Sequence, residues 1–228
     1  MITHFKKIKS LELFAGSRSF SKVAEKNNFL TYSTDINNFE NIDDVCDIDN
    51  FNLLKLINDF GVPDIIWASP PCTTFSIASV SHHWNKDKTP KTQAAFKGLQ
   101  IIHETLSIIQ IIKRFNKNIK FVIENPRGML RKMGIIDNKL LNTVTYCTYG
   151  DKRMKPTDIW TNIKWIPRKM CKNGMPCHES APRGSRSGTQ GLKNDFERSK
   201  VPSELCQEII ESFLKEWQRT FNPLSFRE

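Results

Sequence analysis

The sequence predicts an α/β protein in which helices cover both faces of a parallel sheet. Strand-like and helix-like segments alternate along most of the chain, and this alternation is typical of a doubly wound sheet. The chain has 228 residues, of which 39% are hydrophobic and 25% are charged. That composition is ordinary for a globular protein with a sizeable core, and it excludes collagen and long disordered chains.

The predicted elements follow one another in a regular order. The stretch 92–116 has apolar residues at spacings of three and four, which predicts a long helix with Ala95, Ile102 and Ile109 on its buried face. The mostly apolar run 63–69 predicts a strand buried on both faces. We expect strands at 9–14, 30–36, 63–69, 119–124 and 143–149, a turn at 15–17, and helices at 19–27, from 49 or 50 to 59 with Phe51, Leu54 and Ile57 on one face, and at 92–116.

The chain changes character after residue 162. Residues 163–200 are rich in Gly, Ser, Pro and basic residues, and they predict a small loop-rich insertion. Pro202 then starts a last helix whose apolar residues Leu205, Ile209, Phe213 and Trp217 share one face. We therefore expect a catalytic domain over 1–162, the insertion over 163–200, and a C-terminal helix over 201–228 that packs back on the sheet.

The charge is positive and uneven. Lys and Arg number 34 against 24 Asp and Glu, for a net charge of +10, and residues 151–200 contain 12 basic and 5 acidic residues. A basic segment in a less basic chain suggests a polyanion such as nucleic acid, although solubility charge on a lysine-rich surface explains it equally well. We expect no transmembrane helix, because no run of about eighteen apolar residues is present, and no secretory signal.

Candidate ligand-binding residues follow the predicted strands. Gly16 permits a tight turn after the first strand, and Asp35 ends the second strand, where a carboxylate can accept both hydroxyls of a ribose. Asp47 and Ile48 follow the next extended piece and are placed to meet an adenine ring. The glycine turn alone is a weak signal, but the ordered set predicts a cofactor that contains adenosine.

Candidate catalytic residues end two other strands. Cys72 follows Pro70 and Pro71, whose fixed φ angles stiffen the turn, and a thiol at this edge of the sheet is a candidate nucleophile. Glu124, in the sequence Glu-Asn-Pro, ends another buried strand and can hydrogen-bond or protonate a ring nitrogen. The alternatives are a buried structural thiol and a helix-capping carboxylate.

These motifs in this order, together with the later Val201, Pro202 and Leu205, resemble the cytosine-5 DNA methyltransferase family and most closely its short phage or viral members. The resemblance spans essentially the whole chain. It implies a Rossmann-like sheet that uses S-adenosylmethionine to methylate carbon 5 of cytosine in DNA. It implies that Cys72 adds to carbon 6 of a flipped cytosine while Glu124 holds ring nitrogen 3.

The resemblance also assigns residues to the cofactor and to DNA. Those implied at the cofactor are Phe14, Gly16, Ser17, Asp35, Asp47, Ile48 and Pro70. Arg153 is the best match to an arginine that positions the flipped base, and residues 163–200 stand where the family carries its target-recognition segment. Basic residues of that segment, namely Arg168, Lys169, Lys172, Arg183, Arg186 and Lys193, are expected at phosphates. Two positions depart from the family pattern: Arg18 replaces a second glycine, and Ser199 replaces an asparagine.

Some alternatives stay open. Cys171, Cys177 and His178, with or without Cys147, are a possible zinc site, but their spacing is not a standard ligand pattern, so we expect unlinked residues and no metal. The function has two rivals: methylation of cytosine in transfer RNA, and a degenerate relative that binds without turnover. We expect a monomer that acts on double-stranded DNA, in the cytoplasm of a bacterial or phage-infected cell or in the nucleus for a eukaryotic virus, in a role such as restriction-modification.

Overall fold

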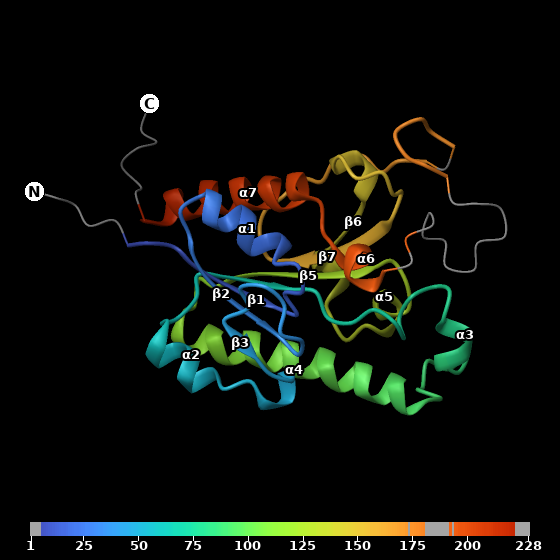
Figure 1. The fold of residues 1–228 in the computed structure, drawn as a ribbon, viewed down its shortest axis with the longest axis horizontal. Helices are drawn as coiled ribbons and strands as arrows, with labels where there is room; N and C mark the ends of the chain where they lie inside the picture. Colours follow the sequence, from blue (N-terminus) through green and yellow to red (C-terminus); the bar gives the residue numbers. More distant parts are fainter. Residues whose placement is uncertain (1–5, 173, 181–191, 193, 222–228) are drawn as a thin grey trace, which may run out of the picture.

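A seven-stranded sheet runs through the middle of the protein, and helices pack on both of its faces (Figure 1). The computed structural model describes residues 6–172, 174–180, 192 and 194–221. The elements are, in chain order, β1 (Lys9–Leu13), α1 (Ser19–Lys26), β2 (Leu30–Asp35), β3 (Asp44–Val45), η1 (Ile48–Asn50), α2 (Leu53–Asp59), β4 (Ile65–Ala68), α3 (Val80–His83), α4 (Gln93–Phe115), β5 (Lys120–Pro126), α5 (Leu130–Met133), η2 (Asn138–Leu140), β6 (Leu141–Thr145), η3 (Tyr146–Tyr149), β7 (Pro156–Thr161), α6 (Asp195–Ser199) and α7 (Ser203–Phe221).

The strands lie in the order β3-β2-β1-β4-β5-β7-β6. The first five strands of this order pair in parallel, whereas β7 is antiparallel to both of its neighbours, β5 and β6. The chain order reverses between β1 and β4, and ligands of doubly wound sheets bind beyond the carboxyl ends of the strands at such a point. The predicted α/β fold is confirmed, with one reversed strand that we did not predict.

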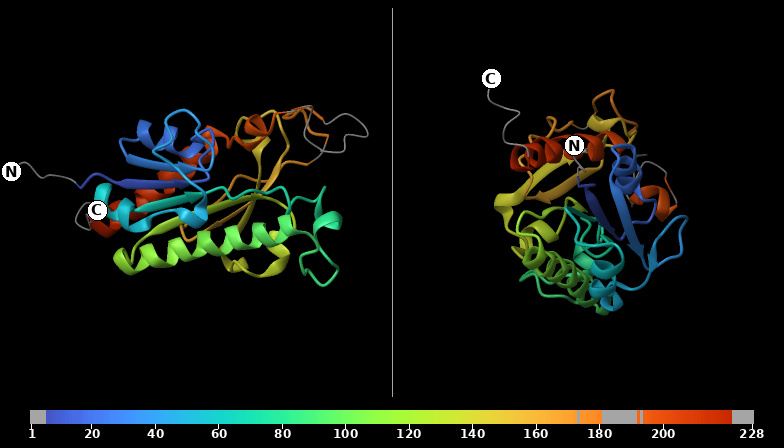
Figure 2. Two further views of the ribbon diagram at one scale, coloured as in Figure 1. Left: turned by 60° about the horizontal axis from the view of Figure 1, so that its bottom comes forward. Right: turned by 90° about the vertical axis from the view of Figure 1, so that its left-hand side faces the viewer.

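The sheet separates two hydrophobic cores (Figure 2). Helices α2 and α4 cover one face, and α1 and α7 cover the other, as the end-on view shows. Strand β4 is buried throughout and supplies both cores, because successive side chains point to opposite faces: Ile66 enters the core under α4, and Trp67 enters the core under α1 and α7. Each large side chain buried in this way contributes about 1.5–3 kcal/mol to folding.

The helix expected over residues 49–59 is divided in two. Asn52 caps α2 by accepting a hydrogen bond from the backbone N–H of Lys55, so this helix begins later than predicted. Within α2, the side chain buried in the core is that of Leu56. Leu56 is 1% exposed, whereas Leu54, which we expected on one face with Phe51 and Ile57, is 69% exposed.

The strand expected over residues 143–149 is also shorter. It ends at Thr145, and the 3-10 turn η3 follows. Gly150, with a φ of +82°, then reverses the chain, and β7 returns antiparallel to β6. We did not predict β7, because its sequence follows a basic stretch that reads as a loop. The two strands form a hairpin at the edge of the sheet.

Residues 163–200 leave the sheet after β7. Trp165 is buried in the core beneath α7, whereas Ile166 is 91% exposed. The short helix α6 lies within this segment, which we expected to be loop throughout. Three of the basic residues expected at phosphates, Arg183, Arg186 and Lys193, lie outside the described residues.

Among the described helices, none combines the length and the apolar character needed to cross a lipid bilayer.

Candidate active site

The predicted site residues follow the carboxyl ends of neighbouring parallel strands. Leu13 of β1 pairs with Ala68 of β4, and Ala68 in turn has Ile123 of β5 opposite it on its other side. The segments that continue from these three positions therefore emerge side by side at one edge of the sheet. They are the glycine turn (residues 14–17), the Cys72 loop (residues 69–79) and the last residues of β5.

The glycine turn is fixed by the neighbouring strand. Gly16 has a φ of +47°, which L side chains rarely adopt, and its N–H donates a hydrogen bond of 2.9 Å to Oδ2 of Asp35 at the end of β2. Phe14 also has a positive φ, of 58°. A Cβ at Gly16 would meet a single atom within 4 Å, the hydroxyl of Ser199 at 3.8 Å. The turn therefore offers open backbone to a ligand.

Arg18, in place of a second glycine, is buried between α1 and β2 and is only 7% exposed. Its guanidinium pairs with Glu25 of α1 and donates to the hydroxyls of Ser33 and Thr31 on β2, each at 3.3 Å. The side chain thus packs below α1 and does not cover the glycine turn.

Glu12, which we did not single out, fixes the start of α1. Its carboxylate is buried in β1 and accepts hydrogen bonds from the N–H groups of Phe20 and Ser21, at 3.1 and 2.7 Å. Burial raises the pKa of Glu12, and the hydrogen bonds from Ser21 act in the opposite direction. A glutamate between two apolar residues, Leu11 and Leu13, was the available signal for this cap.

The Cys72 loop begins with a tight turn. The carbonyl of Cys72 accepts hydrogen bonds of 3.0 Å from the N–H groups of Phe75 and Ser76. The side chain of Asn125, next to Glu124 on β5, donates to the carbonyl of buried Pro70 at 3.0 Å. This bond ties the Pro-Pro-Cys sequence directly to the Glu-Asn-Pro sequence.

Gly128 holds the other end of the Cys72 loop. The N–H of Met129 donates to the carbonyl of Phe75 at 2.7 Å, and Ser76 forms an antiparallel bridge with Gly128. A Cβ at position 128 would stand 2.1 Å from the carbonyl oxygen of Phe75, a separation that real Cβ atoms essentially never show. Only glycine permits this approach, so the loop is seated on the connection between β5 and α5.

Glu124 is 4% exposed and has two polar partners. The hydroxyl of Tyr146 donates a hydrogen bond of 2.8 Å to Oε1 of Glu124, and Nζ of Lys155 lies 3.7 Å from the same oxygen. Nζ of Lys155 also lies 4.8 Å from the centre of the Tyr146 ring. Burial and the charge of Glu124 raise the pKa of Tyr146 well above its ordinary value, so this hydroxyl remains a donor.

Glu124, Tyr146 and Lys155 form a group that we call the Glu124 cluster, and its charges act on the Cys72 thiol. Burial raises the pKa of Cys72, the charge of Lys155 lowers it, and the carboxylate of Glu124 raises it. The hydrogen bond from Asn125 to the carbonyl of Pro70 holds the start of the Cys72 loop beside the end of β5, which carries Glu124. A nucleophile, a carboxylate and a cation meet at one edge of the sheet, and this combination suits addition to an electron-poor ring with proton transfer to its nitrogen.

Residues 8–150, more than half of the chain, match the family described as C-5 cytosine-specific DNA methylase. The chain belongs to that family. A probable DNA (cytosine-5)-methyltransferase of Frog virus 3 (isolate Goorha) is 28% identical to this methylase in an alignment 219 residues long, which covers 88% of this chain and 98% of the viral protein. The solved structure of the Entamoeba histolytica methyltransferase EhMeth matches with a TM-score of 0.48 and 14% identity. That match covers 77% of this chain, which spans only 59% of the EhMeth chain.

Arg153 of this methylase, expected at the flipped base, has its donors engaged elsewhere. The residue is 8% exposed, and its guanidinium pairs with Asp151. It also donates to the backbone carbonyls of Arg198 at 2.9 Å and Lys200 at 3.1 Å. In the described structure, Arg153 fastens the end of α6 to the β6–β7 hairpin.

The remaining residues expected at the cofactor lie along the same edge. Asp47 caps η1 by accepting a hydrogen bond from the N–H of Asp49 at 3.2 Å, and it lies 3.6 Å from Nζ of Lys97 on α4. Ile48 is 8% exposed and packs in the core under α4. Ser17 shares a hydrogen bond of 2.8 Å with the hydroxyl of Ser19 at the start of α1.

Sequence reasoning missed two residues that contact Glu124: Tyr146 and Lys155. Tyr146 and Lys155 flank the turn of the β6–β7 hairpin, so recognising that hairpin would have brought them to the edge of β5. The signal was a pair of Thr-rich and β-branched stretches separated by Gly150.

Proposed function

We propose that the chain transfers a methyl group from S-adenosylmethionine to carbon 5 of cytosine in double-stranded DNA, through a covalent adduct of Cys72 with the base. The meeting of the Cys72 loop with the Glu124 cluster carries this proposal. Membership of the cytosine-specific DNA methylase family and the viral relative support the reaction and the substrate.

The residues at the edge of β1 and β2 suit the cofactor. A Cβ at Gly16 would fill space that the turn leaves open, so backbone can approach the methionine part closely. Oδ2 of Asp35 accepts a hydrogen bond from the N–H of Gly16 and keeps a second lone pair for a ribose hydroxyl, whereas Oδ1 accepts hydrogen bonds from both the backbone N–H and the side-chain amide of Asn37. We assign the methionine and ribose to Phe14, Gly16, Ser17, Asp35 and Pro70, and the adenine to Asp47 and Ile48. The bound cofactor supplies an electrophilic methyl group on a sulfonium.

Chain residues activate the base. A cytosine extruded from the duplex presents its ring face to Cys72, whose thiolate adds to carbon 6. Glu124 holds ring nitrogen 3 and provides the proton that balances the negative charge from this addition. Carbon 5 then carries the electron density needed to accept a methyl group. A water molecule accepts the carbon 5 proton, Cys72 leaves as the thiolate, and the proton on ring nitrogen 3 returns to Glu124, which restores the aromatic ring.

Tyr146 and Lys155 position the carboxyl group of Glu124. The hydroxyl of Tyr146 donates to one carboxyl oxygen of Glu124, Oε1, and the ammonium group of Lys155 faces the same oxygen. The group is therefore oriented from one side. Lys155 also favours the thiolate of Cys72, because its charge lowers the pKa of that thiol.

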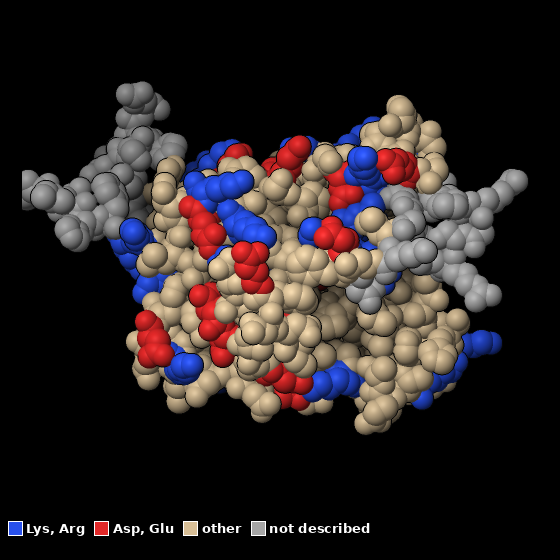
Figure 3. All heavy atoms as spheres, in the orientation of Figure 1, with Lys and Arg blue, Asp and Glu red and all other residues tan. Residues whose placement is uncertain are grey.

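We propose further that residues 163–200 contact the DNA. Lys169 and Lys172 are exposed and available to phosphates. Arg168, also expected there, instead pairs with Glu204 and Glu208 of α7, at 2.7 and 2.8 Å. On the face in Figure 3, basic and acidic residues are intermixed, so this face is not a uniformly basic surface. We propose that the protein acts as a monomer.

The test is methyl transfer from labelled S-adenosylmethionine to duplex DNA and, in parallel, to transfer RNA. We expect label in DNA, bisulfite-resistant cytosines at defined sequences, and a covalent complex with DNA containing 5-fluorocytosine. Cys72→Ser should abolish both product and complex, whereas Cys46→Ser, at a free and partly buried cysteine, should retain them. Label in RNA alone, or a Cys72→Ser variant that still forms the complex, overturns the proposal.

A further inference from the structure

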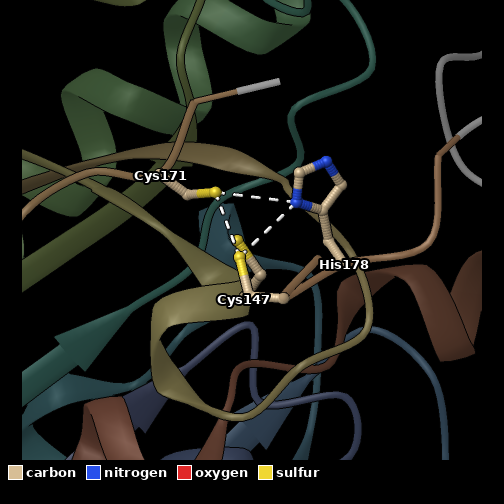
Figure 4. Close-up of side chains that lie close together, drawn as sticks. Cys147, Cys171 and His178 are labelled. Atoms are coloured by element: carbon tan, nitrogen blue, oxygen red, sulfur yellow. Dashed lines mark hydrogen bonds between the residues drawn. The ribbon is translucent and has the colours of Figure 1, made fainter. Parts of the chain in front are cut away.

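Four potential metal ligands meet beside the β6–β7 hairpin, although we expected them to be unlinked. One ligand atom each of Cys147, Cys171, Cys177 and His178 lies within 4.8 Å of all the others. The sulfurs of Cys171 and Cys177 are 3.1 Å apart, and each is 3.6 Å from Nδ1 of His178. Figure 4 shows the side chains of Cys147, Cys171 and His178 pointing toward one common space.

The ligands come from two parts of the chain. Cys147 is buried in η3, directly after β6, whereas the other three belong to the segment 163–200. Two hydrogen bonds hold this segment against the hairpin near the cluster: the N–H of Cys171 donates to the hydroxyl of Thr145 at 2.8 Å, and the N–H of Glu179 donates to the carbonyl of Lys152 at 2.9 Å. These two hydrogen bonds hold the backbone in a position that brings the four ligand side chains close together.

Although Trp165 and Arg168 hold the start of the segment against α7, the segment buries few apolar side chains near the ligands. Ile166 is 91% exposed and Met175 is 52% exposed, so large apolar side chains here face solvent instead of a core. A metal ion commonly supplies the missing stability in short segments with too small a core.

We propose that Cys147, Cys171, Cys177 and His178 bind one structural zinc ion in a tetrahedral Cys3His site. Three thiolates and one imidazole are a standard zinc ligand set, and soft sulfur ligands exclude magnesium and calcium. Bonds of about 2.3 Å at tetrahedral angles separate neighbouring sulfurs by about 3.8 Å. The observed ligand spacings bracket this value, so small side-chain rotations complete the site. All four positions are occupied by protein, which is the closed arrangement of a structural metal.

The four ligands lie next to a residue that contacts Glu124. Cys147 is the neighbour of Tyr146, whose hydroxyl donates to Glu124. A metal bound at Cys147 therefore fastens segment 163–200 to the residue beside the catalytic carboxylate. The inference stands on ligand geometry, so metal content tests it independently of methyl transfer.

The experiment measures zinc in the full-length protein after a chelator wash, by elemental mass spectrometry. We expect one zinc ion per chain in the wild type, and retention below about a tenth of that in Cys177→Ser and His178→Ala. Cys177 is exposed, so its substitution should leave the fold intact. The controls are Cys46→Ser and His103→Ala, which should keep the full zinc content. Protein prepared with cobalt should show the thiolate charge-transfer and ligand-field absorption of a tetrahedral site, and this absorption should be lost in Cys177→Ser.

Two outcomes overturn the proposal. One is zinc content that is low in the wild type or equal in wild type and Cys177→Ser. The other is a disulfide between Cys171 and Cys177 in protein purified without reductant, seen as a mass lower by two hydrogens. Strong chelation should also lower the melting temperature of the wild type and not that of Cys177→Ser, so the proposal remains testable even where a variant folds poorly.

Discussion

Replacing Gly128 with alanine tests whether the seat of the Cys72 loop controls catalysis. The new Cβ would stand 2.1 Å from the carbonyl oxygen of Phe75, where at least 3.0 Å is normally required. The obstacle is backbone, so no side-chain rotation relieves it. The loop must move by about 1 Å, which breaks or stretches the 2.7 Å hydrogen bond from Met129 to Phe75.

The displacement sets the size of the expected effect. The carbonyl of Cys72 accepts hydrogen bonds from the N–H groups of Phe75 and Ser76, so a shift of Phe75 also moves Cys72. A misplacement of about 1 Å costs about a hundredfold in rate. Overpacking of this kind costs about 1–3 kcal/mol of stability, which lowers the melting temperature by about 2–12 °C in a chain of this size. We therefore expect kcat for methyl transfer to fall about a hundredfold in a folded protein.

Gly134→Ala is the matched control. Gly134 ends α5 with a φ of +71°, and no atom of the described residues lies within 4 Å of an added Cβ. Alanine there costs about 1–2 kcal/mol through backbone strain, so the protein should lose comparable stability without a displaced Cys72 loop. Equal activity losses in the two variants, or full activity in Gly128→Ala, would refute the reasoning.

Three further outcomes are expected from the Glu124 cluster and its surroundings. Tyr146→Phe removes a donor 2.8 Å from Glu124 and should lower kcat by about ten- to a hundredfold, the equivalent of about 1.5–3 kcal/mol, without loss of the fold seen by circular dichroism. Burial raises the pKa of Cys72, so the rate should rise with pH as the thiolate forms; Lys155→Met removes a charge that lowers this pKa and should shift the pH–rate profile to higher pH, whereas an unshifted profile would contradict this role. Arg153→Ala should increase hydrogen exchange in α6, because its guanidinium no longer holds the carbonyls of Arg198 and Lys200.

Segments whose own residues determine their structure were predictable from the sequence. The apolar face of α4 and the wholly apolar sequence of β4 each fix how the element packs against a core. Both elements lie close to where we expected them. The order of these elements also placed Gly16, Cys72 and Glu124 at strand ends. Because the carboxyl ends of parallel strands lie at the same edge of a sheet, the common location of these three residues could be inferred from the sequence.

What the sequence did not reveal depends on contacts between distant segments. Arg153 and Lys155 are both cations in one short basic stretch, and both reach the carbonyl of Arg198 in α6. Only Lys155 also lies 3.7 Å from Glu124, and the path of the hairpin decides this difference. The four metal-ligand candidates were named from the sequence, but we expected them to be unlinked. Cys147 is 24 residues before Cys171, and no local spacing relates it to the other three.

The reversed strand β7 explains how these contacts arise. In a parallel strand, Lys155 would stand at the opposite edge of the sheet from Glu124, because a strand's first residue lies at its amino end. Antiparallel pairing instead places the start of β7 beside the end of β5, with Thr157 opposite Pro126. Tyr146 arrives at the same edge because it follows the last residue of β6, and its N–H bonds the carbonyl of Lys155 at 3.2 Å. A single change of strand direction thus supplies both groups that orient Glu124. It also brings Cys147 to the side of the hairpin where segment 163–200 returns.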